Sequence, residues 1–134
     1  MPLVADVSAI LAQALDDEDA SYAEAVIAAI ADDEAIVPPL FWFEIRNALL
    51  MCERRQRISN LGTESFLADL ALLPIQVAEM PTESAVLGLA RMHRLTVYDA
   101  TYLELARRRR LPLATLDEAL RSAASREGVA LFQP

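Results

Sequence analysis

Four acidic residues interrupt or border apolar segments of this sequence, whereas most of the other acidic residues lie in charged runs or on polar helix faces. Asp6 is the only charged residue in the run LVADVSAIL, and no basic residue lies near it in the chain. Glu44 borders the apolar stripe of a predicted helix, and Asp99 and Asp117 each stand where a predicted helix begins. Because burying a carboxylate without a partner costs free energy, these positions are the first candidates for a functional site.

Carboxylates brought close together repel one another, and each raises the pKa of the next unless a cation neutralises them. Mg²⁺ and Mn²⁺ prefer oxygen ligands of this kind, and a water bound to such an ion can become nucleophilic near neutral pH. The ion also stabilises charge that builds on a phosphoryl oxygen. If the four acids converge, they favour metal-assisted hydrolysis of a phosphodiester.

The scarcity of other reactive residues narrows the chemistry further. The chain has one cysteine, Cys52, and one histidine, His93, so an internal disulfide and a zinc site rich in cysteine or histidine are excluded. It has no lysine, which excludes Schiff-base chemistry and a phosphate-binding loop lysine. Its 3 glycines are widely separated and form no glycine-rich phosphate cradle. Carboxylate, with 20 Asp and Glu residues, is the group that remains abundant.

Each of the four acids also has an interpretation that requires no function. Asp99 and Asp117 would cap their helices and complement the helix dipole. Glu44 would be a solvated residue at a helix edge, and Asp6 would cap a helix that follows the first strand. These alternatives stay open for each residue alone, and only the joint pattern favours a site.

Apolar runs separated by helical patterns predict one domain over residues 1–134 with a three-layer α/β/α sandwich. Strands that are apolar throughout indicate a mostly parallel central sheet with helices on both faces. The sites of such sheets lie beyond the carboxyl ends of the strands, where Asp6 and Asp117 are expected. The predicted strands cover residues 2–6, 35–39, 75–80, 111–116 and 129–132. The predicted helices cover residues 19–33, 40–55, 63–74, 82–94, 98–110 and 117–127.

The net charge of −8 argues against a nucleic-acid partner until its distribution is considered. Residues 1–34 hold 9 acids and no arginine, whereas residues 35–134 hold 11 acids and all 12 arginines. The arginine runs ERRQR and ARRRR would contact RNA phosphates or, at a helix C-terminus, simply complement the helix dipole. Trp42 and Phe43 would stack a base or pack in the core or in an interface.

The segments around the four acids carry a family resemblance. VADVSA, FWFEIRNAL, TVYDATYLELA and PLATLDEAL resemble, in order and spacing, the motifs of PIN-domain ribonucleases, and the chain looks most similar to VapC-type toxins of bacterial toxin–antitoxin pairs. The resemblance implies a catalytic acidic site that holds Mg²⁺ or Mn²⁺, formed by Asp6, Glu44, Asp99 and Asp117. It implies supporting positions at Ser8, Asn47 and Thr115.

The supporting positions have alternatives of their own. Ser8 would cap a helix, and Thr115 would only fill a strand. Asn47 lies three residues after Glu44 and therefore on the same helix face, which favours a role for it.

The resemblance implies an endoribonuclease toxin that cuts cellular RNA, forms a homodimer and is neutralised by a small antitoxin protein. Neither a signal peptide nor a membrane span is recognisable, so we expect a cytoplasmic protein. The alternative is a non-catalytic PIN-like module that acts through dimer or partner binding. A haloacid-dehalogenase-like phosphohydrolase also begins with a strand and an Asp, but it needs a second Asp where this chain has Ser8, and it needs a lysine.

Overall fold

The computed structural model describes residues 1–134, and its centre is a sheet of four parallel strands in the order β3-β2-β1-β4. The strands are short: β1 (Leu3–Ala5), β2 (Ala35–Val37), β3 (Ile75–Val77) and β4 (Leu113–Ala114). Every residue of β1, β2 and β4 is buried, whereas β3 at the edge is largely exposed. Burial on both faces is the reason that these strands show no alternation of apolar and polar residues.

Seven α-helices and one 3-10 helix surround the sheet. None of them is long and apolar enough to span a bilayer. They are, in chain order, α1 (Val7–Ile10), η1 (Leu11–Ala14), α2 (Ser21–Asp32), α3 (Phe41–Arg54), α4 (Asn60–Ala71), α5 (Glu83–His93), α6 (Val97–Arg109) and α7 (Glu118–Arg126).

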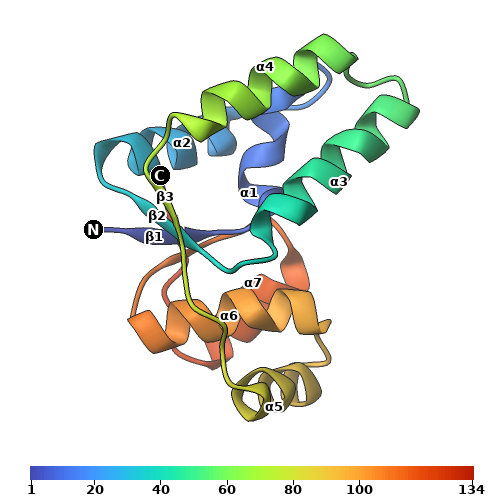
Figure 1. The fold of residues 1–134 in the computed structure, drawn as a ribbon. Coiled ribbons are helices and arrows are strands. Elements are labelled where there is room, and N and C mark those ends of the chain that lie inside the picture. The colour runs from blue at the N-terminus through green and yellow to red at the C-terminus, as the bar shows by residue number, and fades with distance from the viewer.

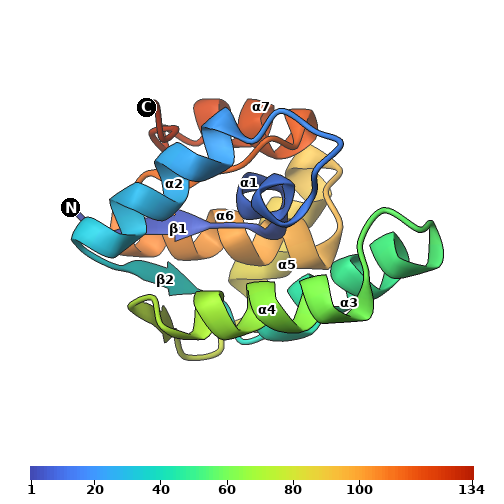
Figure 2. The same ribbon diagram turned by 90° about the horizontal axis from the view of Figure 1, so that it is seen from above.

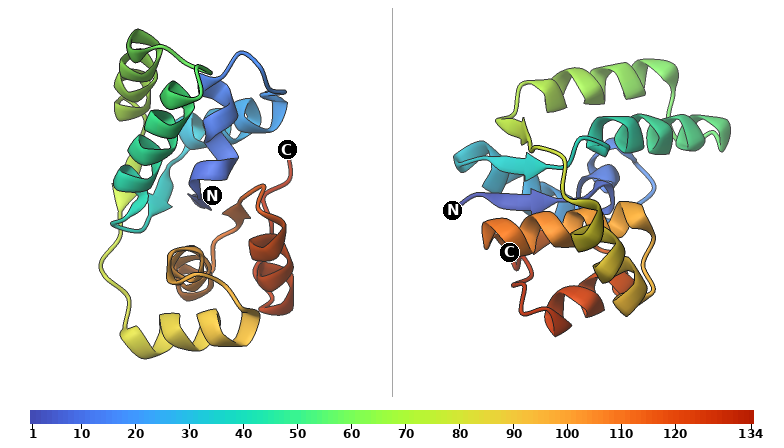
Figure 3. Two further views of the ribbon diagram at one scale, coloured as in Figure 1. Left: turned by 90° about the vertical axis from the view of Figure 1, so that its right-hand side faces the viewer. Right: turned by 60° about the horizontal axis from the view of Figure 1, so that its bottom comes forward.

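The strand order explains how the helices divide between the two faces of the sheet. The chain moves from β1 to β2 to β3 in one direction and then returns past β1 to β4. Connections between parallel strands are right-handed. The helices that connect β1, β2 and β3 therefore cover one face, and the helices of the return from β3 to β4 cover the other. Figure 1 shows α1–α4 on one side of the sheet and α5–α7 on the other, and the left view of Figure 3 agrees. Figure 2, seen from above, shows α1 in front of α6. The predicted α/β/α sandwich with a parallel sheet is confirmed.

Helix α6 is the most deeply buried helix and carries Asp99 in its first turn. Residues 100–106 are all buried, because α6 packs against β1 and β4 and also against α5 and α7. A helix enclosed on several sides must be apolar around most of its circumference, as the segment ATYLELA is. This packing fixes the beginning of α6 at the edge of the sheet.

The structure differs from the predicted elements at both ends of the chain. Helix α1 begins directly after Asp6 and is only four residues long, which is too short to produce a helical repeat in the sequence. The predicted strand over residues 129–132 is reduced to a single bridge between Leu131 and Leu113. Gly128 ends α7 as predicted, with a φ of +72° that favours glycine.

Candidate active site

The candidate site lies where the chain leaves two neighbouring strands, β1 and β4, in opposite directions. Strands β1 and β4 are adjacent, yet the chain after β1 proceeds toward β2, whereas β4 ends the return from β3. In open parallel sheets such a switch point opens a crevice at the carboxyl ends of the strands. Asp6 follows β1, and its backbone N–H donates to the Ala114 carbonyl at the end of β4, 3.1 Å away. The topology therefore brings together residues that are more than a hundred positions apart.

Asp6 is 5% exposed and accepts three hydrogen bonds. The hydroxyls of Ser8 and Thr115 donate to Oδ1 and Oδ2, each over 2.6 Å, and the Ala9 N–H donates to Oδ1 over 3.1 Å. No arginine forms an ion pair with it. Burial raises the pKa of Asp6 from 3.8 to about 6, and the charge of Asp99 adds to the increase, although the three hydrogen bonds oppose it. The carboxylate is thus rigidly oriented but not neutralised.

Ser8 and Thr115 join the ends of the two strands through their hydroxyls. Ser8 Oγ accepts from the Leu116 N–H at 2.9 Å, and Thr115 Oγ1 accepts from the Asp117 N–H at 3.1 Å. Both residues were predicted to support the site, and the structure places both against Asp6. The same hydrogen bonds therefore fix the backbone position of a second acid, Asp117.

Glu44 lies in the first turn of α3 and is held by a residue that we did not predict. The Tyr102 hydroxyl, on the buried helix α6, donates to Glu44 Oε1 over 2.6 Å. Partial burial raises the pKa of Glu44, the charge of Asp99 raises it further, and the Tyr102 hydrogen bond lowers it. A signal for Tyr102 was present in the sequence, because a tyrosine within a largely apolar helical segment needs a partner for its hydroxyl.

Asp99 and Asp117 differ in their relation to the helices that they were predicted to cap. Asp117 does cap α7, since its Oδ1 accepts from the Leu120 N–H at 2.9 Å. The cap of α6 is instead Thr96, whose hydroxyl accepts from the Asp99 N–H at 3.0 Å. The Asp99 carboxylate is therefore not engaged as a cap, and its pKa is raised by partial burial and by the charge of Asp117.

Electrostatic coupling shows that the four acids share one region. The charge of Asp99 raises the pKa of Asp6 and of Glu44, and the charge of Asp117 raises the pKa of Asp99. Asp99 is the acid common to all three relations. None of the four pairs with a basic side chain, so their mutual repulsion is not relieved by the protein.

The acids do not form a closed set of metal ligands. No three side chains among the Asp, Glu, His and Cys residues lie close enough to hold one ion together. The donor set suits a hard cation nevertheless, because Mg²⁺ retains several waters and is commonly bound directly by only one or two carboxylates. The arrangement therefore fits an ion bound partly through water.

The remaining predicted residue, Asn47, is exposed on α3 and has no side-chain hydrogen bond, so the structure does not join it to the acids. Arg121 is the basic residue that sequence analysis missed, and its Nη1 donates to the Thr115 carbonyl at 2.9 Å. Its place one turn after Asp117, on the same face of α7, is a signal that could have identified it.

The ARRRR run is mostly engaged within the protein. Arg107 pairs with Glu127 over 3.1 Å, Arg109 pairs with Glu79 over 3.0 Å, and Arg108 pairs with Glu79 and with Glu104. Only Arg110 has no ion pair in this run. The structure therefore favours the interpretation that the run stabilises the end of α6 over the interpretation that it binds RNA.

Comparisons with known proteins agree with this architecture. The solved structure of PAE2754 from Pyrobaculum aerophilum matches with a TM-score of 0.68 at 24% identity, over 92% of this chain and 84% of that one. The structure of VapC20 from Mycobacterium tuberculosis, described as a sarcin-ricin loop cleaving toxin, matches with a TM-score of 0.66 at 14% identity, over 98% of this chain and 99% of that one. These identities show a shared fold. No curated protein sequence matches the chain.

The sequence itself identifies the family. The model of the PIN domain matches residues 3–125, which include β1 and all four acids. The chain therefore belongs to the PIN domain family.

Proposed function

We propose that this protein is a metal-dependent endoribonuclease of the VapC toxin type, which hydrolyses RNA phosphodiester bonds with Mg²⁺ or Mn²⁺. The observation that carries the proposal is the coupling of Asp6, Glu44 and Asp117 to Asp99 without a basic residue to neutralise them. Uncompensated carboxylates at a sheet edge are costly, and a divalent cation relieves that cost. The similarity in fold to a toxin described as cleaving the sarcin-ricin loop supports the choice of RNA as substrate.

Each acid has a distinct role in this proposal. Asp6 and Asp99 would hold the ion, because Asp6 is oriented by two hydroxyls and the Asp99 carboxylate is not used as a helix cap. Glu44 and Asp117 would bind its waters. The bound ion would supply a nucleophilic water and stabilise charge on the phosphoryl oxygen. Ser8 and Thr115 position Asp6, and Tyr102 positions Glu44.

The proposal is tested by cleavage of a structured RNA with Mg²⁺ or Mn²⁺ and with EDTA. We expect Asp6→Asn to lose nearly all activity while it keeps its fold, and we expect EDTA to abolish cleavage by the unchanged protein. Asp16→Asn is the matched control, because Asp16 is an exposed acid in the loop that precedes α2. Cleavage that persists in EDTA, or in Asp6→Asn, would contradict the proposal.

The partners follow from the same proposal. We expect a homodimer and a small VapB-like antitoxin that neutralises the toxin in the cytoplasm. Coexpression with the product of a short reading frame directly upstream should yield a stable complex without nuclease activity. The molar mass of the purified protein in solution checks the dimer.

A non-catalytic PIN-like interaction module is the second candidate. One observation favours it, namely that no three acids are close enough to hold one ion together. It predicts partner binding that is unaffected by divalent cations and by Asp99→Asn. The nuclease proposal predicts that both the cations and Asp99 are required for activity.

A further inference from the structure

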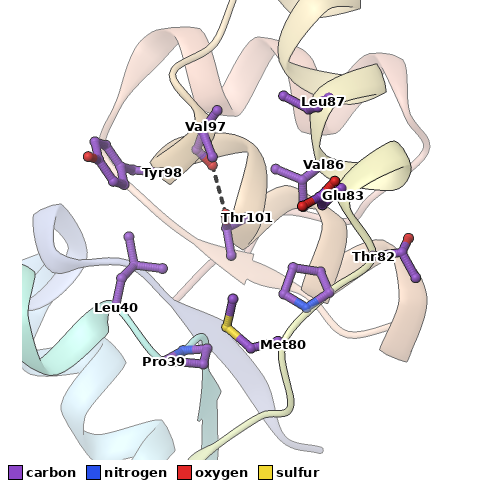
Figure 4. A pocket seen from close by; sticks show the side chains of 11 residues that line it. Pro39, Leu40, Met80, Thr82, Glu83, Val86, Leu87, Val97, Tyr98 and Thr101 are labelled. Carbon is purple, nitrogen blue, oxygen red and sulfur yellow. Dashed lines mark hydrogen bonds between the residues drawn. The ribbon is translucent and has the colours of Figure 1, made fainter.

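A groove of about 480 Å³ has Tyr98, the residue before Asp99, in its wall. It lies between the turn before α3, the segment that enters α5, and the first turns of α5 and α6. Figure 4 shows Pro39 and Leu40 on one side and Val86 and Glu83 on the other, with Tyr98 at one end. Its volume lies within the range of about 300–1,000 Å³ that is typical of small-molecule sites.

The groove and the acidic site share two helical turns. Tyr98 precedes Asp99 in the first turn of α6. Leu40 precedes α3, and its carbonyl accepts the N–H of Glu44 over 2.9 Å. Because Tyr98 and Leu40 line the groove and belong to the turns that carry Asp99 and Glu44, a strand of RNA with a phosphate at the acids would place an adjoining nucleoside at the groove.

The lining of the groove selects against a phosphate and favours a flat, largely apolar group. No arginine lines it, and Glu83 is its single charged residue. The Thr101 hydroxyl is already used, since it donates to the Val97 carbonyl at 2.7 Å, so this residue offers mainly its methyl group. Tyr98 is 61% exposed and presents an aromatic ring at the rim. Unpaired RNA bases are commonly bound by stacking on such rings and by hydrogen bonds to their edges.

The Glu83 carboxylate determines which base edge can form hydrogen bonds in the groove. An ionised carboxylate only accepts hydrogen bonds, so its partner must present N–H donors. Guanine carries two neighbouring donors, N1–H and N2–H, that match the two carboxylate oxygens, whereas uracil has one N–H, and the donors of adenine and cytosine belong to a single amino group. Carboxylates are known to accept hydrogen bonds from base amino groups, for example from N4 of cytosine in the major groove of DNA.

We propose that this groove is a base-binding subsite that takes a guanine next to the scissile phosphate, with Tyr98 stacking on the base and Glu83 accepting from its Watson–Crick edge. The inference rests on the proposed ribonuclease function. A protein side chain or a second copy of this chain in the groove are the competing occupants.

The first test compares cleavage of short single-stranded RNAs that differ only in the base beside the cleaved bond. We expect the unchanged protein to prefer guanine in kcat/KM, and we expect Glu83→Gln to reduce that preference by about tenfold or more. Tyr98→Ala should lower kcat/KM for guanine substrates, and Tyr98→Phe should restore it because the ring is kept. Glu24→Gln is the matched control, since Glu24 is also an exposed acid in the first turn of a helix. Unaltered base preference in both Glu83→Gln and Tyr98→Ala would overturn the inference.

The second test does not depend on cleavage. Guanosine 5′-monophosphate is titrated into the full-length protein and followed by NMR, with the three other nucleoside monophosphates as comparisons. Shifts confined to Val97, Tyr98 and Thr101, larger for guanosine than for the others, support the subsite even if the protein does not cleave RNA. Shifts elsewhere, or none, overturn it even if the protein is a ribonuclease. A dimer that dissociates in Tyr98→Ala without a change in base preference would assign the groove to a second copy and also overturn the inference.

Discussion

The Asp6 carboxylate is held by three hydrogen bonds and by no cation. Two of the donors, Ser8 and Thr115, are 107 positions apart in the sequence, yet their hydroxyl oxygens lie 3.2 Å from each other, so residues far apart in the chain orient the carboxylate together. Desolvation nevertheless dominates, and the pKa of Asp6 rises to about 6. At neutral pH the ionised Asp6 therefore lowers the stability of the folded protein, even though its side chain caps α1.

The first prediction concerns Asp6 and the pH dependence of stability. Its folded pKa is about 6 and its unfolded value is 3.8, so the folded state binds the proton more tightly. The stabilising contribution of protonated Asp6 to the free energy of unfolding is fully present below about pH 4. It is lost as the pH rises through 6, and its upper limit is about 3 kcal/mol. In EDTA, Asp6→Asn should become more stable relative to the unchanged protein as the pH increases from 4 to 8. Urea unfolding at several pH values measures the difference, and a difference that does not vary with pH would contradict the prediction.

The second prediction concerns Tyr102, whose hydroxyl donates to Glu44. Tyr102→Phe removes this hydrogen bond and keeps the buried ring. Because the bond lowers the pKa of Glu44, the variant should have a higher pKa at Glu44, and the acidic limb of its pH–rate profile should move to higher pH. Loss of a residue that orients a metal-site carboxylate commonly costs about 10–100-fold in activity. Tyr98→Phe is the control, and equal profiles for the two variants would show that Tyr102 does not act through Glu44.

At the scale of elements, the sequence predicted the helices and the four main strands because each is a long or purely apolar segment. It did not predict α1, since four residues give no helical period, although the capping alternative for Asp6 anticipated it. Asp99 was assigned to a helix start, but Thr96 is the cap, because the helix begins two residues before Asp99. Contacts such as Tyr102 with Glu44 depend on packing between distant elements, which local patterns do not encode.

The third prediction compares two helix caps. Thr96 caps α6 and Ser59 caps α4, each by accepting the N–H of the residue three positions later. Thr96→Ala and Ser59→Ala should each lower the free energy of unfolding by about 1 kcal/mol. Only Thr96→Ala should also lower nuclease activity, because its donor is Asp99. Thr96→Ser, which keeps the hydroxyl, should restore both properties. Equal loss of activity in the two alanine variants would show that stability, rather than the position of Asp99, is responsible.

At the scale of the whole molecule, four of the twelve arginines form ion pairs with acidic side chains: Arg57 and three residues of the ARRRR run. Arg57 pairs with Asp17 and Glu18 and so joins the acidic loop after η1 to the turn that follows α3. The proposed RNA substrate is a polyanion, whereas the protein carries a net charge of −8. Binding of a divalent cation at the acids would reduce the local repulsion, so RNA binding as well as catalysis should depend on the metal.

The last prediction is the effect of metal on global stability. An ion that binds only the folded state raises its stability by about 2.7 kcal/mol at a concentration one hundred times its Kd. We therefore expect Mn²⁺ to raise the Tm of the unchanged protein, and we expect the increase to be larger at pH 7.5 than at pH 5, where a proton already neutralises part of Asp6. Asp99→Asn should lose most of the increase, because Asp99 is coupled to each of the other three acids. Asp69→Asn, at an exposed position on α4, should retain it. An equal increase in Asp99→Asn would place the ion elsewhere, for example at the acidic residues 16–19, and the four carboxylates would then require another explanation.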